Sequence, residues 1–111
     1  MRRGEIYAAA TGGGFGGKPR PVLIIQGDDY VPGPHVIVAL IGSPVENPPS
    51  IRIPVAATTA NGLNHDSLIE VDILVTVKHT QFGPRFGTLE TEAMDRVDRA
   101  LLTLLGFGAG R

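Results

Sequence analysis

The hydrophobic pattern of the chain predicts short strands separated by Gly and Pro residues. Pro21–Gln26 and His35–Ile41 are apolar almost throughout and rich in β-branched residues, which is typical of buried strands. Glu5–Ala9 predicts a shorter strand. Ile51–Val55 alternates apolar and polar residues but contains a proline, so it predicts an edge strand, whereas Ser67–Ile73 predicts a half-buried strand.

From Thr91 onward the period of the pattern changes to that of a helix. The apolar residues then recur at Met94, Val97, Leu101 and Leu104 with Leu105. Thr91 is the expected N-cap and Gly106 the expected end of this amphipathic helix. Short strands followed by one helix predict a mainly β fold with a C-terminal helix, built as a small antiparallel barrel with the helix packed across it.

Length and composition narrow the possible classes of protein. A chain of 111 residues predicts one domain over 1–111. It contains no cysteine, which excludes disulfides and thiolate metal sites. No apolar run approaches the roughly 20 residues that span a bilayer, and no signal-peptide pattern begins the chain, so we expect a cytoplasmic protein without membrane contact.

Charge is distributed unevenly although it nearly cancels overall. The chain has 10 basic and 11 acidic residues, a net charge of -1. Among the first twenty residues, however, only Glu5 opposes four basic side chains: Arg2, Arg3, Lys18 and Arg20. We therefore expect an anionic ligand to bind the N-terminal half of the protein.

The stretch "TGGGFGGKPRP" (Thr11–Pro21) satisfies two nucleotide-binding patterns letter by letter, G-x-G-x-x-G and G-x-x-x-x-G-K. A phosphate-binding loop must lead into a helix, because the N–H groups of the helix N-terminus hold the phosphate. Here Pro19 and a β-branched strand follow instead, and Lys18 lacks the Ser or Thr that would bind magnesium. The stretch therefore predicts a cationic hairpin loop.

Five segments together resemble a known family: "RRGEIY" (Arg2–Tyr7), "KPRPVLIIQGDDY" (Lys18–Tyr30), "VIVALIGS" (Val36–Ser43), "DSLIEVD" (Asp66–Asp72) and "GTLETEAMDRVDRALLTLLGF" (Gly87–Phe107). In this order and spacing they resemble the MazF/PemK-type toxins of bacterial type II toxin–antitoxin systems. The resemblance implies an SH3-like small β-barrel of the CcdB/MazF kind. It also implies a homodimeric mRNA interferase, a sequence-specific and ribosome-independent endoribonuclease that cuts single-stranded RNA without metal or other cofactor, and a cognate antitoxin as partner.

Metal-free RNA cleavage uses the 2′-hydroxyl of the substrate as nucleophile. The protein must take its proton, stabilise charge on the phosphate and protonate the leaving 5′-oxygen. The resemblance places the electrostatic catalyst at Arg20, whose planar guanidinium can donate two hydrogen bonds to a phosphate. It places a catalytic hydroxyl at Ser43, because Gly42 stands where the threonine of the family usually sits. His79 is a further candidate for general acid or base.

Other residues are candidates for RNA contact, because single-stranded bases stack on aromatic rings and phosphates bind cations. The candidates are Phe15, Lys18, Asp72, Lys78, Phe82 and Arg85. Asp72 matches an aspartate of the family. Glu70 and Leu74 stand where arginines occur in the family, which predicts weaker phosphate binding. No His and carboxylate pair has metal-ligand spacing, so no metal site is predicted.

Two rival functions remain open at this point. A CcdB-like toxin shares the barrel but poisons DNA gyrase by binding it, and the "KPRPVLII" block favours the nuclease over this class. A degenerate family member would bind RNA or antitoxin without cutting, and Gly42, Glu70 and Leu74 are compatible with it.

Overall fold

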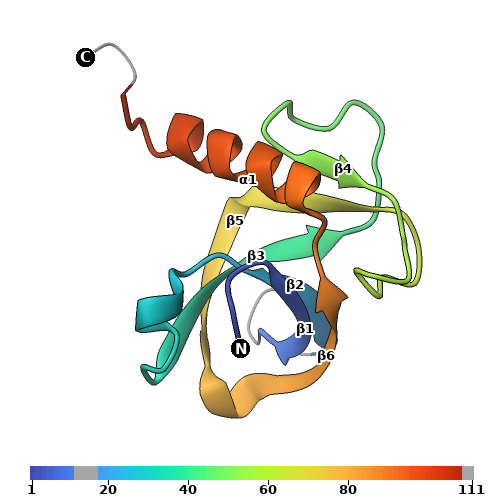
Figure 1. Ribbon diagram of the computed structural model, residues 1–111. Helices are drawn as coiled ribbons and strands as arrows, with labels where there is room; N and C mark the ends of the chain where they lie inside the picture. Colours follow the sequence, from blue (N-terminus) through green and yellow to red (C-terminus); the bar gives the residue numbers. More distant parts are fainter. Residues whose placement is uncertain (12–17, 109–111) are drawn as a thin grey trace.

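The computed structural model describes residues 1–11 and 18–108, which form a curled antiparallel sheet and one helix (Figure 1). The strands are β1 (Glu5–Ala10), β2 (Pro19–Ile24), β3 (His35–Gly42), β4 (Ile53–Val55), β5 (Ser67–Lys78) and β6 (Phe82–Thr88). The remaining elements are the 3-10 turns η2 (Asp28–Tyr30) and η3 (His79–Gln81) and the helix α1 (Thr91–Leu104). The sheet order is β4-β5-β3-β2-β1-β6. A mainly β fold with a C-terminal helix is thereby confirmed.

Strands β2 and β3 lie at the centre of the sheet because both of their faces are buried. In β2, Leu23 packs into an apolar cluster that includes the helix, while Val22 and Ile24 pack into a second cluster. All three side chains are fully buried. An unbroken apolar run is what two buried faces require, which explains why these strands could be predicted from the sequence.

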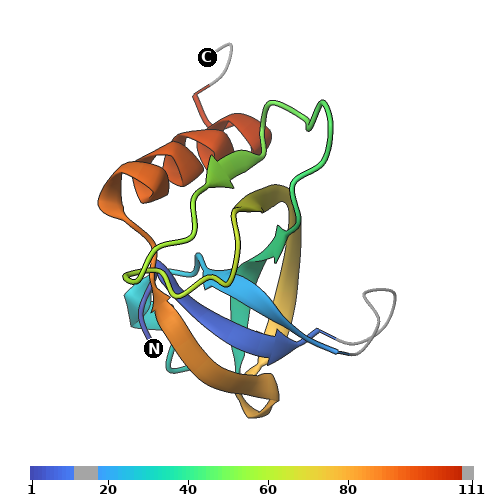
Figure 2. The same cartoon turned by 90° about the vertical axis from the view of Figure 1, so that its right-hand side faces the viewer.

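Helix α1 lies across one face of the sheet and covers the first cluster (Figures 1 and 2). Val97 and Leu101 are buried there, as predicted. Leu104 and Leu105 are 42% and 57% exposed, so their expected core position is wrong. The last turn of the helix runs out beyond the sheet toward the C-terminus (Figure 1). Thr91 begins the helix, but the N-cap residue is Glu90.

The connection between β4 and β5 closes the curl against β6. The amide of Thr88 donates to the carbonyl oxygen of Ala60 at 2.9 Å. Gly62 has φ +71°, and a Cβ there would lie 2.0 Å from the carbonyl oxygen of Phe86. A Cβ on Gly87 would lie 2.2 Å from the oxygen of Ala60. Glycine therefore permits the close approach of two backbones that completes the barrel.

Two strand predictions require correction. β5 continues to Lys78 instead of ending near residue 73, and β6, which contains Phe82 and Arg85, was not among the predicted strands. The segment "FGPRFG" contains two glycines and a proline, which lower strand propensity. It forms a strand because it lies at the edge of the sheet, where the missing N–H of Pro84 leaves the neighbouring ladder intact. No helix among the described residues is long and apolar enough to cross a membrane.

Candidate functional site

Arg20 lies near the start of β2 and pairs in register with Ala9 of β1. Because side chains alternate along a strand, its side chain lies on the same face as the buried Val22. Arg20 is partly buried, and its guanidinium makes no hydrogen bond or ion pair with any other described residue. This unopposed positive charge is the main electrostatic feature of the candidate site.

Phe82 lies across β1 from Arg20, since Ala9 pairs with Arg20 on one side and with Phe82 on the other. The two residues are therefore two strand spacings apart, about 10 Å. The ring of Phe82 meets Tyr7 edge-on at 5.9 Å and lies 6.1 Å from the ring of His79. Phe82 is partly buried by these contacts, and part of it faces solvent beside β1.

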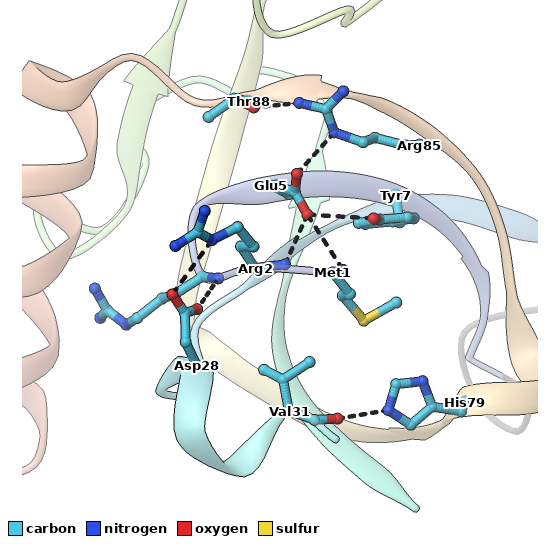
Figure 3. A network of polar contacts seen from close by, with 10 residues as sticks. Met1, Arg2, Glu5, Tyr7, Asp28, Val31, His79, Arg85 and Thr88 are labelled. Atoms are coloured by element: carbon cyan, nitrogen blue, oxygen red, sulfur yellow. Dashed lines mark hydrogen bonds and ion pairs between the residues drawn. The ribbon is translucent and has the colours of Figure 1, made fainter. Parts of the chain in front are cut away.

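His79 is anchored by its ring. Its Nε2 atom lies 2.6 Å from the carbonyl oxygen of Val31 (Figure 3). Because a carbonyl oxygen only accepts, Nε2 carries the proton in this contact, which leaves Nδ1 as the available ring nitrogen. Lys78, which precedes it, is exposed and pairs with His35 at the start of β3.

Ser43 directly follows Gly42 at the other end of β3 and is exposed. At about 3.3 Å per residue, the eight-residue strand separates the two ends by about 23 Å. Ser43 therefore lies far along β3 from Lys78 and His79, and these candidates do not form one cluster.

Gly42 and Arg20 do lie at the same end of paired strands. Val22 of β2 pairs with Leu40 of β3. Arg20 lies two residues before Val22, and Gly42 lies two residues after Leu40. Because the strands are antiparallel, the two residues lie side by side at the same end of the sheet and on the same face. The structure thus brings together the arginine and the threonine-like position that the sequence resemblance singled out.

Asp72 is held by Arg52, the residue that precedes β4. The guanidinium of Arg52 binds both carboxylate oxygens of Asp72, with Nε–Oδ1 at 2.9 Å and Nη2–Oδ2 at 3.0 Å. It also reaches Glu70 at 3.4 Å. These hydrogen bonds lower the pKa of Asp72 and raise that of Arg52 relative to their ordinary values. The pairing of β4 with β5 brings Arg52 against both carboxylates, so its guanidinium is engaged by the protein itself.

Arg85 is also engaged by the protein itself (Figure 3). Its Nε atom lies 3.0 Å from Glu5, and its Nη2 donates to the hydroxyl of Thr88 at 2.6 Å. Glu5 additionally accepts hydrogen bonds from the amide of Arg2 at 2.6 Å and the phenol of Tyr7 at 3.2 Å. Burial, followed by the negative charge of Glu5, raises the pKa of Tyr7 above its ordinary value.

The remaining sequence candidates add little to the group of residues at the Arg20 end of the sheet. Lys18 is exposed just before β2, and Phe15 lies outside the described residues. Within the described part of the chain, no group of three His, Cys, Asp or Glu side chains is placed to hold a metal ion. Sequence reasoning missed the role of Glu5 as a shared acceptor and the position of Glu70 against Gly42, since both depend on strand register.

Similarity to known proteins agrees with this arrangement. Residues 2–105 match the family described as PemK-like, MazF-like toxin of type II toxin-antitoxin system. The chain is 42% identical over 107 residues to a probable endoribonuclease MazF of Mycolicibacterium smegmatis, covering 96% of this chain and 98% of the relative. It is 36% identical over 113 residues to endoribonuclease MazF6 of Mycobacterium tuberculosis, with 95% and 96% covered.

Solved structures show the same fold. The Mycobacterium tuberculosis toxin MazF-mt6 superposes with a TM-score of 0.77 at 26% identity, covering 92% of this chain and 96% of that one. A mycobacterial endoribonuclease in complex with its cognate antitoxin has a TM-score of 0.78 at 19% identity, covering 96% of both chains.

Proposed function

Because the chain belongs to the family of PemK-like, MazF-like toxins of type II toxin–antitoxin systems, we infer that it is an endoribonuclease that cuts single-stranded RNA at preferred sequences. The family resemblance of the sequence motifs is thereby confirmed. Relatives named as endoribonucleases, which match along nearly their whole length, support the activity. The proposed toxin domain comprises the whole chain, residues 1–111, and acts in the cytoplasm, where messenger RNA is found.

The unopposed guanidinium of Arg20 is the observation that carries this proposal. Its backbone is fixed in β2 between two prolines, and no described carboxylate neutralises it. A rigidly placed, planar donor of this kind is suited to the negative charge that develops on the phosphate oxygens during cleavage. The substrate 2′-hydroxyl attacks phosphorus, so we propose that the reaction requires no metal and leaves a 2′,3′-cyclic phosphate and a 5′-hydroxyl.

The other candidates receive roles according to their contacts. Ser43 is proposed as a hydrogen-bond donor to the scissile phosphate, since it lies at the Arg20 end of β3. Phe82, across β1 from Arg20, is proposed to stack a base beside the scissile bond. Lys18 is exposed beside Arg20 and is proposed to bind a neighbouring phosphate.

The more distant candidates are given weaker roles. Lys78 and His79, at the far end of β3, are proposed to contact flanking nucleotides instead of the reacting groups. The contacts of Asp72 with Arg52, and of Arg85 with Glu5, favour a structural role over RNA binding. Phe15 remains a proposed stacking residue outside the described part of the chain.

Two protein partners are proposed. A cognate antitoxin protein would inhibit the enzyme by covering the Arg20 end of the sheet, and the family description as a toxin–antitoxin component supports this partner. A homodimer is proposed because a small sheet with free edges gains protection by pairing with a second copy. Gel filtration at the monomer position over a wide concentration range would contradict the dimer.

Incubation of the purified protein with a long single-stranded RNA in EDTA tests the activity. We expect discrete cuts whose 5′ fragments end in a cyclic phosphate, and much slower cutting by the Arg20→Ala variant. The Arg85→Ala variant is the matched control, because its guanidinium is already bound to Glu5. Intact RNA with a folded wild-type protein would overturn the proposal, and DNA damage in arrested cells would then favour a gyrase poison.

A further inference from the structure

The space over Gly42 is filled by a carboxylate from the neighbouring strand. A Cβ on Gly42 would lie 2.8 Å from Oε2, 3.0 Å from Cδ and 3.2 Å from Oε1 of Glu70. Gly42 does not have the positive φ that calls for glycine. A larger residue at this position would therefore require the Glu70 carboxylate to move, which couples the two positions.

Glu70 is held in this place from one side only. Arg52 makes a bidentate pair of hydrogen bonds with Asp72. It reaches Glu70 through one longer contact, from Nη1 to Oε2 at 3.4 Å. The Oε1 atom of Glu70 accepts no hydrogen bond from any described residue. The side chain is 13% exposed. Glu70 is thus a fixed carboxylate with one oxygen anchored and the other available to a ligand.

Glu70 also lies beside the end of the sheet where Arg20 is found. Val22 pairs with Leu40, and Leu40 pairs with Glu70, so the three residues form a row across β2, β3 and β5. Arg20 lies two residues before Val22 on β2, so its side chain is on the same face of the sheet as this row. The backbones of β2 and β5 are two strand spacings apart, about 10 Å, and the side chain that reaches over Gly42 between them is that of Glu70. Arg20 and Glu70 therefore lie on the same face of the sheet, with Gly42 on the strand between them.

We propose that Glu70 is the general base of the RNA cleavage reaction, with Arg52 as the residue that positions it. This proposal rests on the proposed endoribonuclease function. The Glu70 carboxylate takes the proton of the 2′-hydroxyl, the 2′-oxygen forms a bond to phosphorus, and the bond from phosphorus to the 5′-oxygen breaks. The leaving 5′-oxygen takes a proton from water, and Glu70 later returns its proton to solvent. Arg20 stabilises the charge on the phosphate throughout.

The Glu70→Gln variant tests this role because it keeps the shape of the side chain and removes the base. The cleavage rate at pH 7 should fall by about 10²–10⁴-fold, the usual contribution of a positioned general base. The acidic limb of the wild-type pH–rate profile should disappear. Binding of a non-cleavable 2′-deoxy RNA analogue should be unchanged or tighter, since a negative charge is removed. Arg52 contacts Glu70, Asp72 binds the same guanidinium, and Arg20 lies on the same face of the sheet, so the profile is compared between variants in which these three are intact.

The Gly42→Ala variant provides an independent test of the same pair of residues. Its Cβ must displace the Glu70 carboxylate, so the rate should fall without any change to Glu70 itself. The double variant Gly42→Ala/Glu70→Gln should lose no more than Glu70→Gln alone, because both changes remove one interaction. Glu46→Gln, on the exposed segment after β3, is the matched control and should retain the wild-type rate.

The outcomes separate the two proposals. A wild-type protein that leaves RNA intact contradicts the endoribonuclease function, and Glu70 loses its role with it. A wild-type protein that cuts, together with a Glu70→Gln variant that cuts equally fast with an unaltered pH profile, overturns only the role of Glu70. In that case Glu70 serves merely as a partner of Arg52, and its replacement lowers the melting temperature alone.

Discussion

Arg20 and Arg85 lie on opposite sides of β1, and their surroundings differ completely. Arg20 faces Ala9 across the ladder and has no acceptor among the described residues. Arg85, on β6, binds both Glu5 and Thr88 (Figure 3). In the sequence both are arginines in loop-like segments rich in Gly and Pro. Their difference shows that a cation becomes a candidate for phosphate binding only where the fold leaves it without a carboxylate.

Arg52 extends this contrast to the other edge of the sheet. Its charge alone would suit a phosphate contact, yet Asp72 and Glu70 neutralise it. A fixed ion pair of this kind stabilises the local structure and offers little attraction to a phosphate, since the net charge of the group is not positive. Arg20 thus differs from Arg85 and Arg52 in having no carboxylate partner among the described residues.

The largest difference should be seen in cleavage rates. Replacing Arg20 with Ala is expected to lower the single-turnover rate by about 10²–10³-fold, the usual effect of removing one preorganised donor to the developing charge. Replacing Arg85 with Ala should change it by less than about threefold, because that guanidinium is already paired. Circular dichroism controls for folding. Equal losses in the two variants would break the contrast between the two sides of β1.

Arg52 should matter for stability more than the other two arginines. The Arg52→Ala variant leaves Glu70 and Asp72 without their shared cation, and we expect the free energy of unfolding to fall by about 2 kcal/mol. Arg52→Lys keeps the charge but loses the two-pronged geometry, so it should recover only part of this loss. Urea unfolding measures both, with a constant m-value as the check on a two-state transition. An Arg52→Ala variant with the unfolding free energy of wild type would show that solvent already screens these ion pairs.

Glu5 allows the paired side of β1 to be tested without touching an arginine. Glu5→Gln keeps the shape of the acceptor but loses the charge that holds Arg85 and the N-terminal amine, whose distances are 3.0 Å and 3.9 Å. Because Arg85 is about half exposed and water can replace its partner, we expect a loss of about 1 kcal/mol in unfolding free energy. The cleavage rate should remain within about twofold of wild type. A large loss of rate would instead connect this edge to the reaction.

The elements that could be predicted are those whose pattern is local. β2 and β3 are continuous apolar runs, and the period of Val97 and Leu101 identifies the helix. β6 could not be predicted, because its glycines and proline resemble a loop and only pairing with β1 makes it a strand. Leu104 and Leu105 are exposed because the sheet does not extend beneath them. The helical period of the sequence gives no information on how far the sheet extends.

The site could be predicted only in part, for a similar reason. Arg20 and Ser43 are identified by motifs, but the Glu70–Gly42 contact depends on an irregularity in the β3–β5 ladder. Continuing the register of His35 with Lys78 would place Leu40 opposite Ile73, whereas the observed shift places it opposite Glu70. A bulge of this kind changes which side chain faces the Arg20 end of the sheet, and no spacing in the sequence announces it.

The smallest expected effect concerns acid stability. The pKa of Asp72 is lowered by its hydrogen bonds with Arg52, so its contribution to stability is present above the ordinary carboxyl pKa of about 4 and is lost as the pH falls through its lower folded value. The Asp72→Asn variant should therefore be less stable than wild type at pH 7, by less than about 1 kcal/mol, and the two unfolding curves should converge in acid.

Asp29 is the matched control for this experiment, because it is exposed in η2 and has no ion pair within the described residues. Asp29→Asn should differ little from wild type at either pH, since no native partner is lost. A constant gap between wild type and Asp72→Asn down to pH 2 would mean that the carboxylate charge contributes nothing and that the difference arises from packing. Convergence of the two unfolding free energies with falling pH would show that the Asp72 carboxylate neutralises Arg52 at pH 7. Arg20, which has no such partner among the described residues, would then differ from Arg52 in its charge balance.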